Sequence, residues 1–340
     1  MVYTFELIKH ANIRYRDSLC LLARFELSVM LRSLSIFTEI TEETIGGAAF
    51  LTFTCRELSE SELVFLSGHS AVVFMAQKEG PLLRPLSVPS EAYLPDDLPE
   101  ILKYKGKTSV TFTRMMINVA VSLSSFSPAD APLLLFDPIC GKGTTCFCAL
   151  TAGMNAVGLD ADRKEIREAT DFFTRYLKYH RLKHTVSERS ETLGKETIPL
   201  IGFTFANSRE NWQLGNLRHL TFACADSGLS PALFRRHPAH ILVADFPYGV
   251  QHGPSSPGNY PETLQHLLHR LLPVWKKTLL PGGAVALSFN SLTLNTSLVR
   301  DEFRQAGFVL PDGKDPSDLR HSVEQAVVRD VVFALNTKEV

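Results

Sequence analysis

Short apolar runs alternate with helical patterns from residue 133 to the end of the chain. The first run, "LLLFD" (133–137), is continuously apolar, which is typical of a parallel strand buried on both faces. The runs that follow it are "NAVGLD" (155–160), "LTFACAD" (220–226), "HILVADF" (240–246), "GAVALSF" (283–289) and "QAVVRDVVFAL" (325–335). Strands that alternate with helices predict right-handed crossovers, and therefore an α/β domain with a doubly wound, mostly parallel sheet.

The residues ahead of this region predict a smaller domain. The β-rich runs lie at 2–8, 35–41, 48–55 and 70–77, and the amphipathic helices at 16–34 and 57–68. This β-α-β-β-α-β order, with a turn expected at "EETIGG" (42–47), is the ferredoxin-like pattern. Five prolines in residues 79–100 predict a linker. We therefore expect an α+β ferredoxin-like domain at 1–80, a Pro-rich linker at 81–100 and the α/β domain at 101–340.

The composition is that of a globular protein, with 45% hydrophobic and 21% charged residues. The net charge of −1 gives no overall basic field for nucleic acid, although a local basic face can exist within a neutral total. Candidate phosphate contacts lie at 178–184, 202–219 and 234–237. The alternative is that these short basic runs are solvated helix faces.

The six cysteines show no paired CxxC spacing. Cys140, Cys146 and Cys148 do not fit a metal site, because the last two lie at an apolar helix start and no His is close in sequence. We therefore expect reduced thiols and no metal. The N-terminus lacks a signal-peptide pattern, and no apolar run approaches the ~20 residues that span a bilayer, which predicts a soluble cytoplasmic protein.

The loop "DPICGKGTT" (137–145) connects the first buried strand to a helix. Gly141 and Gly143 permit a tight turn and a close approach of the backbone to a ligand. Thr144 or Thr145 can cap the helix, whose N-terminus favours negative charge. An ordinary strand-to-helix turn is the alternative interpretation, because a lone GxG is a weak signal.

Acidic residues at the ends of neighbouring strands strengthen the ligand interpretation. Asp160 follows about 20 residues downstream, where an acid can bind ribose hydroxyls, although it can also cap the next helix. Asp226 ends a third apolar run and can accept a hydrogen bond from an adenine amino group. GxGxxG and GxxxxGK[ST] are both absent, and Asp137 fits a cofactor with a cationic amino-acid tail, as in S-adenosylmethionine (SAM).

"DPICGKGTT", "GLD", "ACAD" and "DFPYG", in this order, resemble the Rossmann-like class I SAM-dependent methyltransferases. More narrowly, "DFPYG" is similar to the (Asp/Asn/Ser)-Pro-Pro-(Tyr/Phe) signature of the branch that methylates amino groups. The segments 104–121 and 321–335 resemble the THUMP-associated RNA guanine-N2 methyltransferases, especially the tRNA guanine-10 branch. The resemblance covers roughly residues 100–340.

This resemblance implies a SAM site and an RNA substrate, with tRNA favoured. Asp137, Gly141 and Gly143 would line the methionine end of SAM, with Cys140 and Thr144 in the same loop. Asp160 would bind the ribose and Asp226 the adenine. Thr113, at the opening of the preceding helix, would contact the carboxylate of the cofactor.

The catalytic residues implied by the resemblance are Asp245, Phe246, Pro247 and Tyr248. The carboxylate of Asp245 and the carbonyl of Phe246 would accept hydrogen bonds from the target amine. Pro247 would stiffen the turn, and the ring of Tyr248 would stack on the base. Alternatively, Tyr248 is a core aromatic residue and Asp245 is a cap at a strand end.

The chain departs from the family in two ways. Phe246 stands where the family usually has Pro, and Phe is larger and leaves a backbone N–H free. About a hundred residues precede the methyltransferase region, which suffices for the ferredoxin-like part but not for a THUMP module. Two alternatives therefore stay open: methylation of a protein glutamine amide or a small-molecule amine, and a catalytically inactive scaffold.

Overall fold

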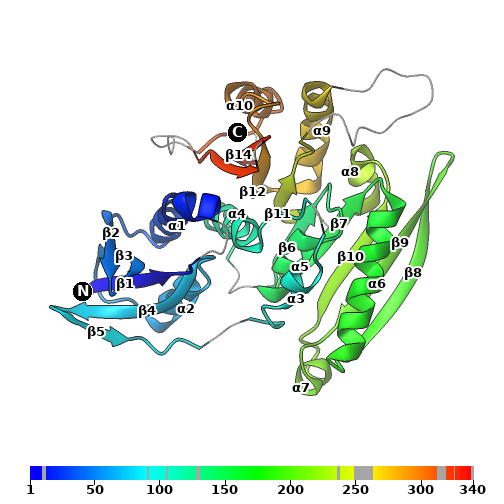
Figure 1. Cartoon of the computed structure of the whole chain (residues 1–340). Helices are drawn as coiled ribbons and strands as arrows, with labels where there is room; N and C mark the ends of the chain where they lie inside the picture. Colours follow the sequence, from blue (N-terminus) through cyan, green and yellow to red (C-terminus); the bar gives the residue numbers. More distant parts are fainter. Residues whose placement is uncertain are drawn as a thin grey trace.

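The computed structural model describes residues 1–9, 13–89, 92–104, 106–127, 131–235, 238–248, 263–311, 319–324 and 326–337. Within these ranges the chain forms a five-stranded sheet and a nine-stranded sheet. Figure 1 shows the smaller sheet in the N-terminal part of the chain and the larger sheet in the C-terminal part.

The smaller sheet is antiparallel throughout, with strand order β2-β3-β1-β4-β5. Its first four strands are β1 (Val2–Leu7), β2 (Ile40–Ile45), β3 (Ala48–Thr54) and β4 (Val72–Glu79). Helix α1 (Ile13–Ser33) follows β1, and α2 (Glu60–Ser67) follows β3. The predicted β-α-β-β-α-β order is therefore confirmed.

The hairpin between β2 and β3 lies further along the chain than the sequence predicted. Strand β2 occupies 40–45, and the expected start at residue 35 is wrong because Ser35 turns the backbone, with φ of 59°. The turn consists of Gly46 and Gly47, whose φ angles of 59° and 85° suit a two-residue hairpin. The polar residues before this pair belong to the strand, although they resembled a turn.

The segment predicted as a linker, 81–100, contains secondary structure. Strand β5 (Leu82–Pro85) pairs with β4 at the edge of the sheet, a position that tolerates Pro. The short helix α3 (Leu98–Ile101) begins near the end of the segment. The domain boundaries at 80 and 100 stay a prediction.

The larger sheet has the strand order β13-β14-β12-β11-β6-β7-β10-β9-β8. Its five central strands are parallel to one another: β6 (Leu134–Asp137), β7 (Asn155–Asp160), β10 (Arg218–Cys224), β11 (Ala239–Asp245) and β12 (Leu279–Asn290). The hairpin of β13 (His321–Glu324) and β14 (Val327–Leu335) joins β12 in antiparallel orientation. The predicted α/β fold class is confirmed, with the parallel strands at the centre of a mixed sheet and antiparallel strands at both of its edges.

Helices cover both faces of this sheet. Neighbouring strand residues point to opposite sides, so Leu135 packs in one apolar cluster and Phe136 in the other. The first cluster includes α4 (Val110–Leu123), α5 (Thr144–Thr151) and α6 (Arg163–Tyr179). The second includes α8 (Ser230–Phe234), α9 (Leu264–Thr278) and α10 (Thr296–Gln305). This layering leaves the ends of the strands to form a site.

A hairpin at one edge of the sheet was not predicted. Strands β8 (His184–Leu193) and β9 (Glu196–Phe205) pair antiparallel, and β9 pairs with β10. Short helix α7 (Arg209–Gln213) follows β9. Nearly all of β8 is exposed, so the apolar alternation that identifies a strand is missing from its sequence.

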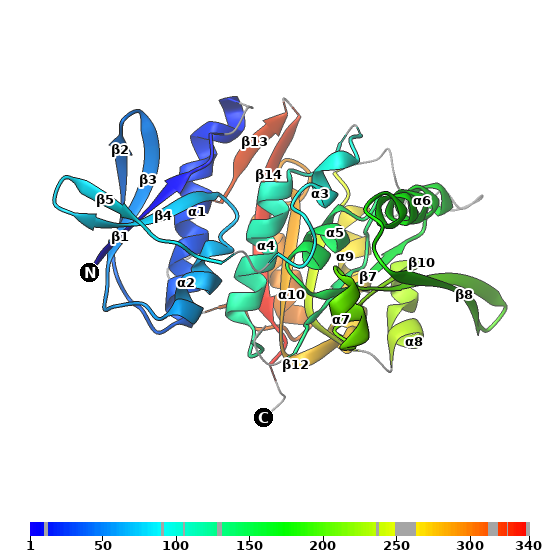
Figure 2. The ribbon, with the colours of Figure 1, turned by 90° about the horizontal axis from the view of Figure 1, so that it is seen from below.

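The N-terminal sheet contacts the C-terminal part through α1, which packs on α4 (Figure 2). The fully buried carboxylate of Glu26 on α1 lies at this contact. It accepts hydrogen bonds from the Ser70 backbone N–H (2.8 Å), the Ser70 hydroxyl and Asn118 Nδ2 of α4 (2.7 Å). His69 Nε2 lies 3.5 Å from it. Since donors from Ser70 and from Asn118 of α4 converge on this one carboxylate, Glu26 helps to fix α1 against α4.

Glu26→Ala should lower the free energy of unfolding by about 3 kcal/mol, because it leaves buried donors without an acceptor. Chemical denaturation measures this change. Arg24→Ala on the same helix is the control, since its ion pair with Glu42 is half exposed and should contribute less than about 1 kcal/mol. Equal effects of the two substitutions would contradict a structural role for the Glu26 contacts.

Candidate active site

Three carboxylates lie at the carboxyl edge of the larger sheet. Asp137, Asp160 and Asp245 end β6, β7 and β11, which are parallel strands, so their side chains meet at one edge. The strand order reverses at β6, which has β7 on one side and β11 on the other. Open α/β sheets bind ligands outside such a reversal point.

The loop after β6 brings its backbone close to neighbouring side chains. Gly143 has φ of 83°, and a Cβ atom there would lie 2.9 Å from the ring of Phe222. Gly143 is also the N-cap of α5 and makes no side-chain capping bond, so the predicted capping by Thr144 or Thr145 is wrong. A glycine is therefore required by both conformation and space.

Tyr104, ahead of α4, covers this loop. Its hydroxyl hydrogen-bonds with that of Thr144 at 2.9 Å, and Lys142 Nζ lies 5.0 Å from its ring centre. Lys142 also forms ion pairs with Glu168 and with Glu165. Burial raises the pKa of Tyr104 to about 12, so its hydroxyl stays protonated at neutral pH.

Asp160 connects the loop to β7. One of its oxygens accepts from the Gly141 N–H and the other from the Asp162 N–H, both at 2.8 Å. The cap of α6 is Asp162, which accepts from the Lys164 N–H at 2.8 Å. The alternative role of Asp160 as the cap is therefore wrong, and its carboxylate faces the loop.

The three carboxylates interact electrostatically. Burial, together with the negative charges of Asp160 and Asp245, raises the pKa of Asp137 to about 7. Burial also raises the pKa of Asp160. A cation at this edge would relieve the repulsion, so the site favours a positively charged group.

Asp245 accepts hydrogen bonds from several segments of the chain. Its donors are the Thr108 hydroxyl, the Ser288 hydroxyl on β12 and the Tyr248 hydroxyl, the last at 2.6 Å. Arg329 of β14 lies 3.6 Å from the same carboxylate. This satisfied environment holds the carboxylate in one orientation.

Arg329 is a buried cation beside this carboxylate, with only 3% of its side chain exposed. Its Nε donates to the Tyr248 hydroxyl at 2.8 Å, and its guanidinium lies over the rings of Phe112 (5.1 Å) and Tyr248 (5.4 Å). Burial and the adjacent Asp245 raise the pKa of Tyr248. His321, also buried here, has its pKa lowered by burial to about 4, so Arg329 supplies the positive charge.

Phe246 belongs to the core below the site. Its side chain is buried in the apolar cluster that faces α9. Its backbone N–H donates to the Ser288 carbonyl at 2.8 Å, which corrects the expectation that this N–H is free. Pro247 and Tyr248 are partly buried, and Gly249, the last residue of "DFPYG", lies outside the described residues.

The remaining predicted cofactor residues lie at different depths. Cys140 is buried, which raises the pKa of its thiol. Thr113 is buried in α4, and its hydroxyl donates to the Ser109 carbonyl at 3.1 Å. Asp226 is exposed, accepts from the Gly228 N–H at 2.7 Å and pairs with Arg270 at 3.0 Å. Of these three residues, only Cys140 lies in the loop at 137–145, which Asp160 contacts.

Four residues of the site were not predicted: Tyr104, Thr108, Ser288 and Arg329. Tyr104 and Thr108 fall in 104–121, and Arg329 in 321–335, the segments that carried the finer family resemblance. Their contact with Asp245 or with Thr144 depends on the tertiary fold. The local sequence pattern therefore could not predict the roles of these four side chains.

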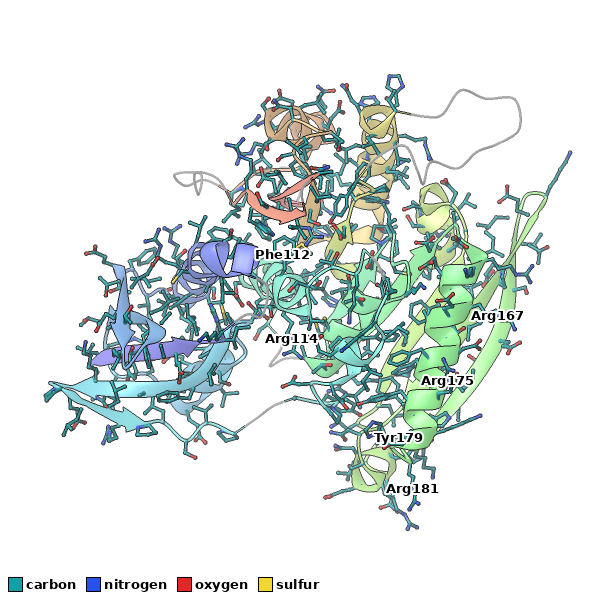
Figure 3. All side chains as sticks on the ribbon, viewed as in Figure 1. Phe112, Arg114, Arg167, Arg175, Tyr179 and Arg181 are labelled. Atoms are coloured by element: carbon teal, nitrogen blue, oxygen red, sulfur yellow. The ribbon has the colours of Figure 1, made fainter. Side chains whose placement is uncertain are left out.

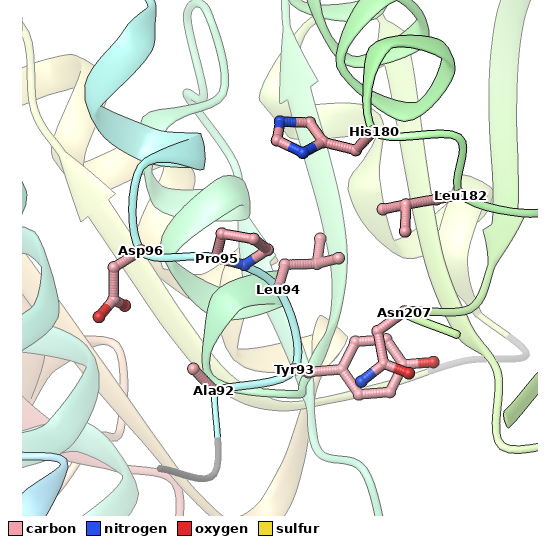
Figure 4. A pocket seen from close by; sticks show the side chains of 8 residues that line it. All are labelled: Ala92, Tyr93, Leu94, Pro95, Asp96, His180, Leu182 and Asn207. Carbon is pink, nitrogen blue, oxygen red and sulfur yellow. The ribbon is translucent and has the colours of Figure 1, made fainter. Parts of the chain in front are cut away.

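A hollow of about 430 Å³ lies elsewhere on the molecule (Figure 4). It is lined in part by Tyr93, His180, Leu182 and Asn207. Leu182 and Asn207 lie beyond the paired ends of β8 and β9, next to the first residue of β10. The hollow therefore lies at the amino edge of the sheet, opposite the three carboxylates.

Among the described ranges, no group of three or more His, Cys, Asp or Glu residues is arranged to hold a metal ion. In the same ranges, no helix has the length and apolar character needed to cross a membrane.

No protein-family profile matches the chain. No curated protein sequence matches it either. Solved structures do match: TrmN from Thermus thermophilus has 18% identity and a TM-score of 0.42 over 88% of this chain and 60% of its own. Magnesium protoporphyrin IX methyltransferase from Synechocystis, with bound SAM, has 14% identity and a TM-score of 0.39, covering 84% of this chain and 100% of its own.

A putative RNA methyltransferase from Pyrococcus horikoshii has 11% identity and a TM-score of 0.39, covering 70% of this chain and 94% of its own. The chain thus spans 60% of the length of the TrmN structure.

Phe246→Pro should lower the free energy of unfolding by about 3–5 kcal/mol, because it removes a buried ring and the N–H bond to Ser288. Phe246→Leu keeps the N–H and should lower it by about 1 kcal/mol. Urea denaturation of both variants measures the difference. A Pro variant as stable as the Leu variant would show that the Ser288 bond is dispensable.

Proposed function

We propose that the protein is a SAM-dependent methyltransferase that acts on an exocyclic amino group, with guanine N2 in RNA as the favoured target and tRNA as the favoured RNA. The observation that supports this most is the convergence of Asp137, Asp160 and Asp245 beside the glycine loop at the reversal point of the sheet. A negative site of this kind suits a cationic cofactor.

The residues present fit SAM. The carboxylates of Asp137 and Asp160 complement its positive charges and its ribose hydroxyls. The loop at Gly141 and Gly143 can bring its backbone close to a ligand, because both residues adopt positive φ. Asp226 lies at the same edge and would reach the adenine if it left Arg270.

When bound, SAM supplies a methyl group activated by its sulfonium. The chain has to position the amine in line and disperse the charge that develops on it. The Asp245 carboxylate and the Phe246 carbonyl accept the two N–H groups, which orients the nitrogen lone pair. Ser288 holds both acceptors, through its hydroxyl on Asp245 and its carbonyl on the Phe246 N–H.

Tyr248 occupies one acceptor position of Asp245 in this structure. An amine that binds Asp245 therefore replaces the Tyr248 hydroxyl, which frees the ring of Tyr248 to stack on the base. Thr108 and Arg329 keep the other oxygen of Asp245 satisfied during this exchange. A base in structured RNA also has to leave its stack to reach this position.

Two alternative functions are compatible with part of this geometry. A glutamine amide or a small-molecule amine has the same N–H donors, so tritium transfer from SAM to bulk tRNA, rRNA and a protein lysate distinguishes the substrates. An inactive scaffold was suggested by Phe246, but its bond to Ser288 keeps the Asp245 site assembled. Absence of SAM binding would exclude both enzyme functions.

SAM binding near pH 7 should release protons, because a bound cation lowers the pKa of Asp137 from about 7. At pH 7 this carboxyl is about half protonated, so up to about 0.5 proton is released. Calorimetry in Tris and in phosphate should give different binding enthalpies. Asp137→Asn should remove this difference, and Asp171→Asn, exposed on α6, should retain it; an unchanged difference in Asp137→Asn contradicts the assignment.

Asp245→Asn should slow methyl transfer by about 100-fold or more, because the amide no longer disperses the positive charge. SAM affinity should change by less than about threefold, since Asp245 faces the amine. Tyr248→Phe keeps the ring and should retain most transfer, whereas Tyr248→Ala should raise KM. Parallel loss of SAM binding and transfer in Asp245→Asn would place this residue in the cofactor site instead.

A further inference from the structure

The C-terminal half of α6 and the turn after it carry exposed cations and an exposed aromatic ring. These residues are Arg175, Lys178, Tyr179, Arg181 and Lys183, here called the α6 basic surface. The side chain of Tyr179 is among the most exposed large side chains, at 84%. Figure 3 shows Arg175, Tyr179 and Arg181 along the end of α6 that lies near α7.

The two halves of α6 differ in whether their cationic side chains form ion pairs. In the first half, Lys164 pairs with Glu168 at 4.0 Å and Arg167 with Asp171 at 3.7 Å. Across the described ranges of the chain, no carboxylate lies within 4.0 Å of the cationic groups of the α6 basic surface. These four cations therefore retain their full attraction for an anionic partner.

Arg181 occupies a backbone position that favours glycine. Its φ is 53°, and it follows the His180 cap in the place where a Schellman motif usually has Gly. The Leu182 N–H closes this motif on the Leu177 carbonyl at 2.9 Å. A long cation at a strained position indicates that the side chain, and not the backbone, is needed there.

The hollow of about 430 Å³ borders this surface (Figure 4). His180 lines it and packs on Tyr176 (4.2 Å) and Tyr179 (5.1 Å). Asn207, Leu182 and Asp96 line the same hollow, which thus combines an amide and apolar and aromatic groups with a carboxylate that pairs with Arg114 at 2.7 Å. Its volume falls in the range of about 300–1,000 Å³ that is typical of ligand pockets.

Beside the hollow, Lys183 Nζ lies 5.0 Å from the ring centre of Trp212. Cations, aromatic rings, of which Tyr179 is exposed, and a hollow with an amide are therefore contiguous at the amino edge of the sheet. Acidic peptides need only the cations, whereas polynucleotides also use aromatic rings for base stacking.

We propose that the α6 basic surface and the adjoining hollow bind a single-stranded polynucleotide. The cations contact successive phosphates, Tyr179 stacks on a base, and the hollow receives an unstacked base whose edge reaches Asn207. The site lies at the opposite edge of the sheet from Asp245 and requires neither SAM nor methyl transfer.

Fluorescence anisotropy of labelled oligoadenylate, in RNA and DNA forms of about 16 nucleotides, tests this proposal with the full chain. The variant Arg175→Gln/Lys178→Gln/Arg181→Gln should bind about tenfold or more weakly. Its slope of log affinity against log salt should shrink by about 2, for three lost phosphate contacts. Comparing the affinities of the RNA and DNA forms shows whether the sugar contributes to binding.

The matched control is Arg163→Gln/Lys164→Gln/Arg167→Gln, which changes the net charge equally on the other half of the same helix. It should alter affinity by less than about threefold. Equal weakening by both triple variants would overturn the proposal, because it would reflect net charge alone.

Tyr179→Ala should weaken binding by about fivefold or more, and Tyr179→Phe should retain it, because only the ring is needed for stacking. Arg181→Gly should bind more weakly while its melting temperature is unchanged or higher, since glycine relieves the positive φ.

Polyglutamate is a second probe, which tests whether the surface binds an acidic protein instead. If it binds as tightly as the oligonucleotides and Tyr179→Ala has no effect, the surface takes an acidic protein and the proposal is wrong. Asp245→Asn should bind the oligonucleotides normally, which separates this result from the outcome for methyl transfer.

Discussion

The carboxylate of Asp245 joins segments that are far apart in the sequence. Thr108 precedes α4, Ser288 lies on β12, Tyr248 follows β11 and Arg329 lies on β14, and all of them converge on this group. A partly buried charge is stabilised when its donors are in place, and each of these contacts depends on the packing of a different element. The order of β12 and β14 beside β11 is thus a condition for the site as well as a feature of the sheet.

A second constraint is the repulsion among Asp137, Asp160 and Asp245. Burial, together with the charges of Asp160 and Asp245, raises the pKa of Asp137 to about 7, and strongly perturbed carboxyl groups of this kind are typical of functional sites. Arg329 balances Asp245, and the backbone N–H groups of Gly141 and Asp162 balance Asp160. Asp137 accepts a hydrogen bond from the Ile139 N–H at 3.1 Å, but it is the most deeply buried of the three. Its pKa should therefore respond most to a bound cation.

Much of the fold was predictable because its signals are local. The continuous apolar run at 133–137 and its successors predicted the parallel strands, and their acidic ends predicted which edge carries the site. Hairpin β8–β9 was missed because β8 is exposed along nearly its whole length and shows no alternation. Ser288 and Arg329 were missed for another reason: their contacts with Asp245 span 43 and 84 residues, and only the folded sheet brings them together.

Phe246 shows how a departure from a motif can be neutral for the site. Proline at this position would lack the N–H that binds the Ser288 carbonyl, whereas Phe makes this bond and fills the core beneath it. Since Ser288 also donates to Asp245, one residue of β12 contacts both Asp245 and Phe246. Strand β12, which a motif comparison does not include, therefore explains how Phe is accommodated at this position.

The two proposed sites also constrain each other through the sheet. The α6 basic surface lies at the amino edge and Asp245 at the carboxyl edge, and a six-residue strand such as β7 separates these edges by about 20 Å. A small-molecule amine cannot contact both edges, whereas a folded RNA, or a protein that carries a target glutamine, is large enough to do so. Contacts at the amino edge would position such an RNA without touching the target base, as phosphate contacts do in other complexes. Binding of a substrate at the far edge would therefore separate a macromolecular substrate from a small-molecule amine by size, independently of the chemistry at Asp245.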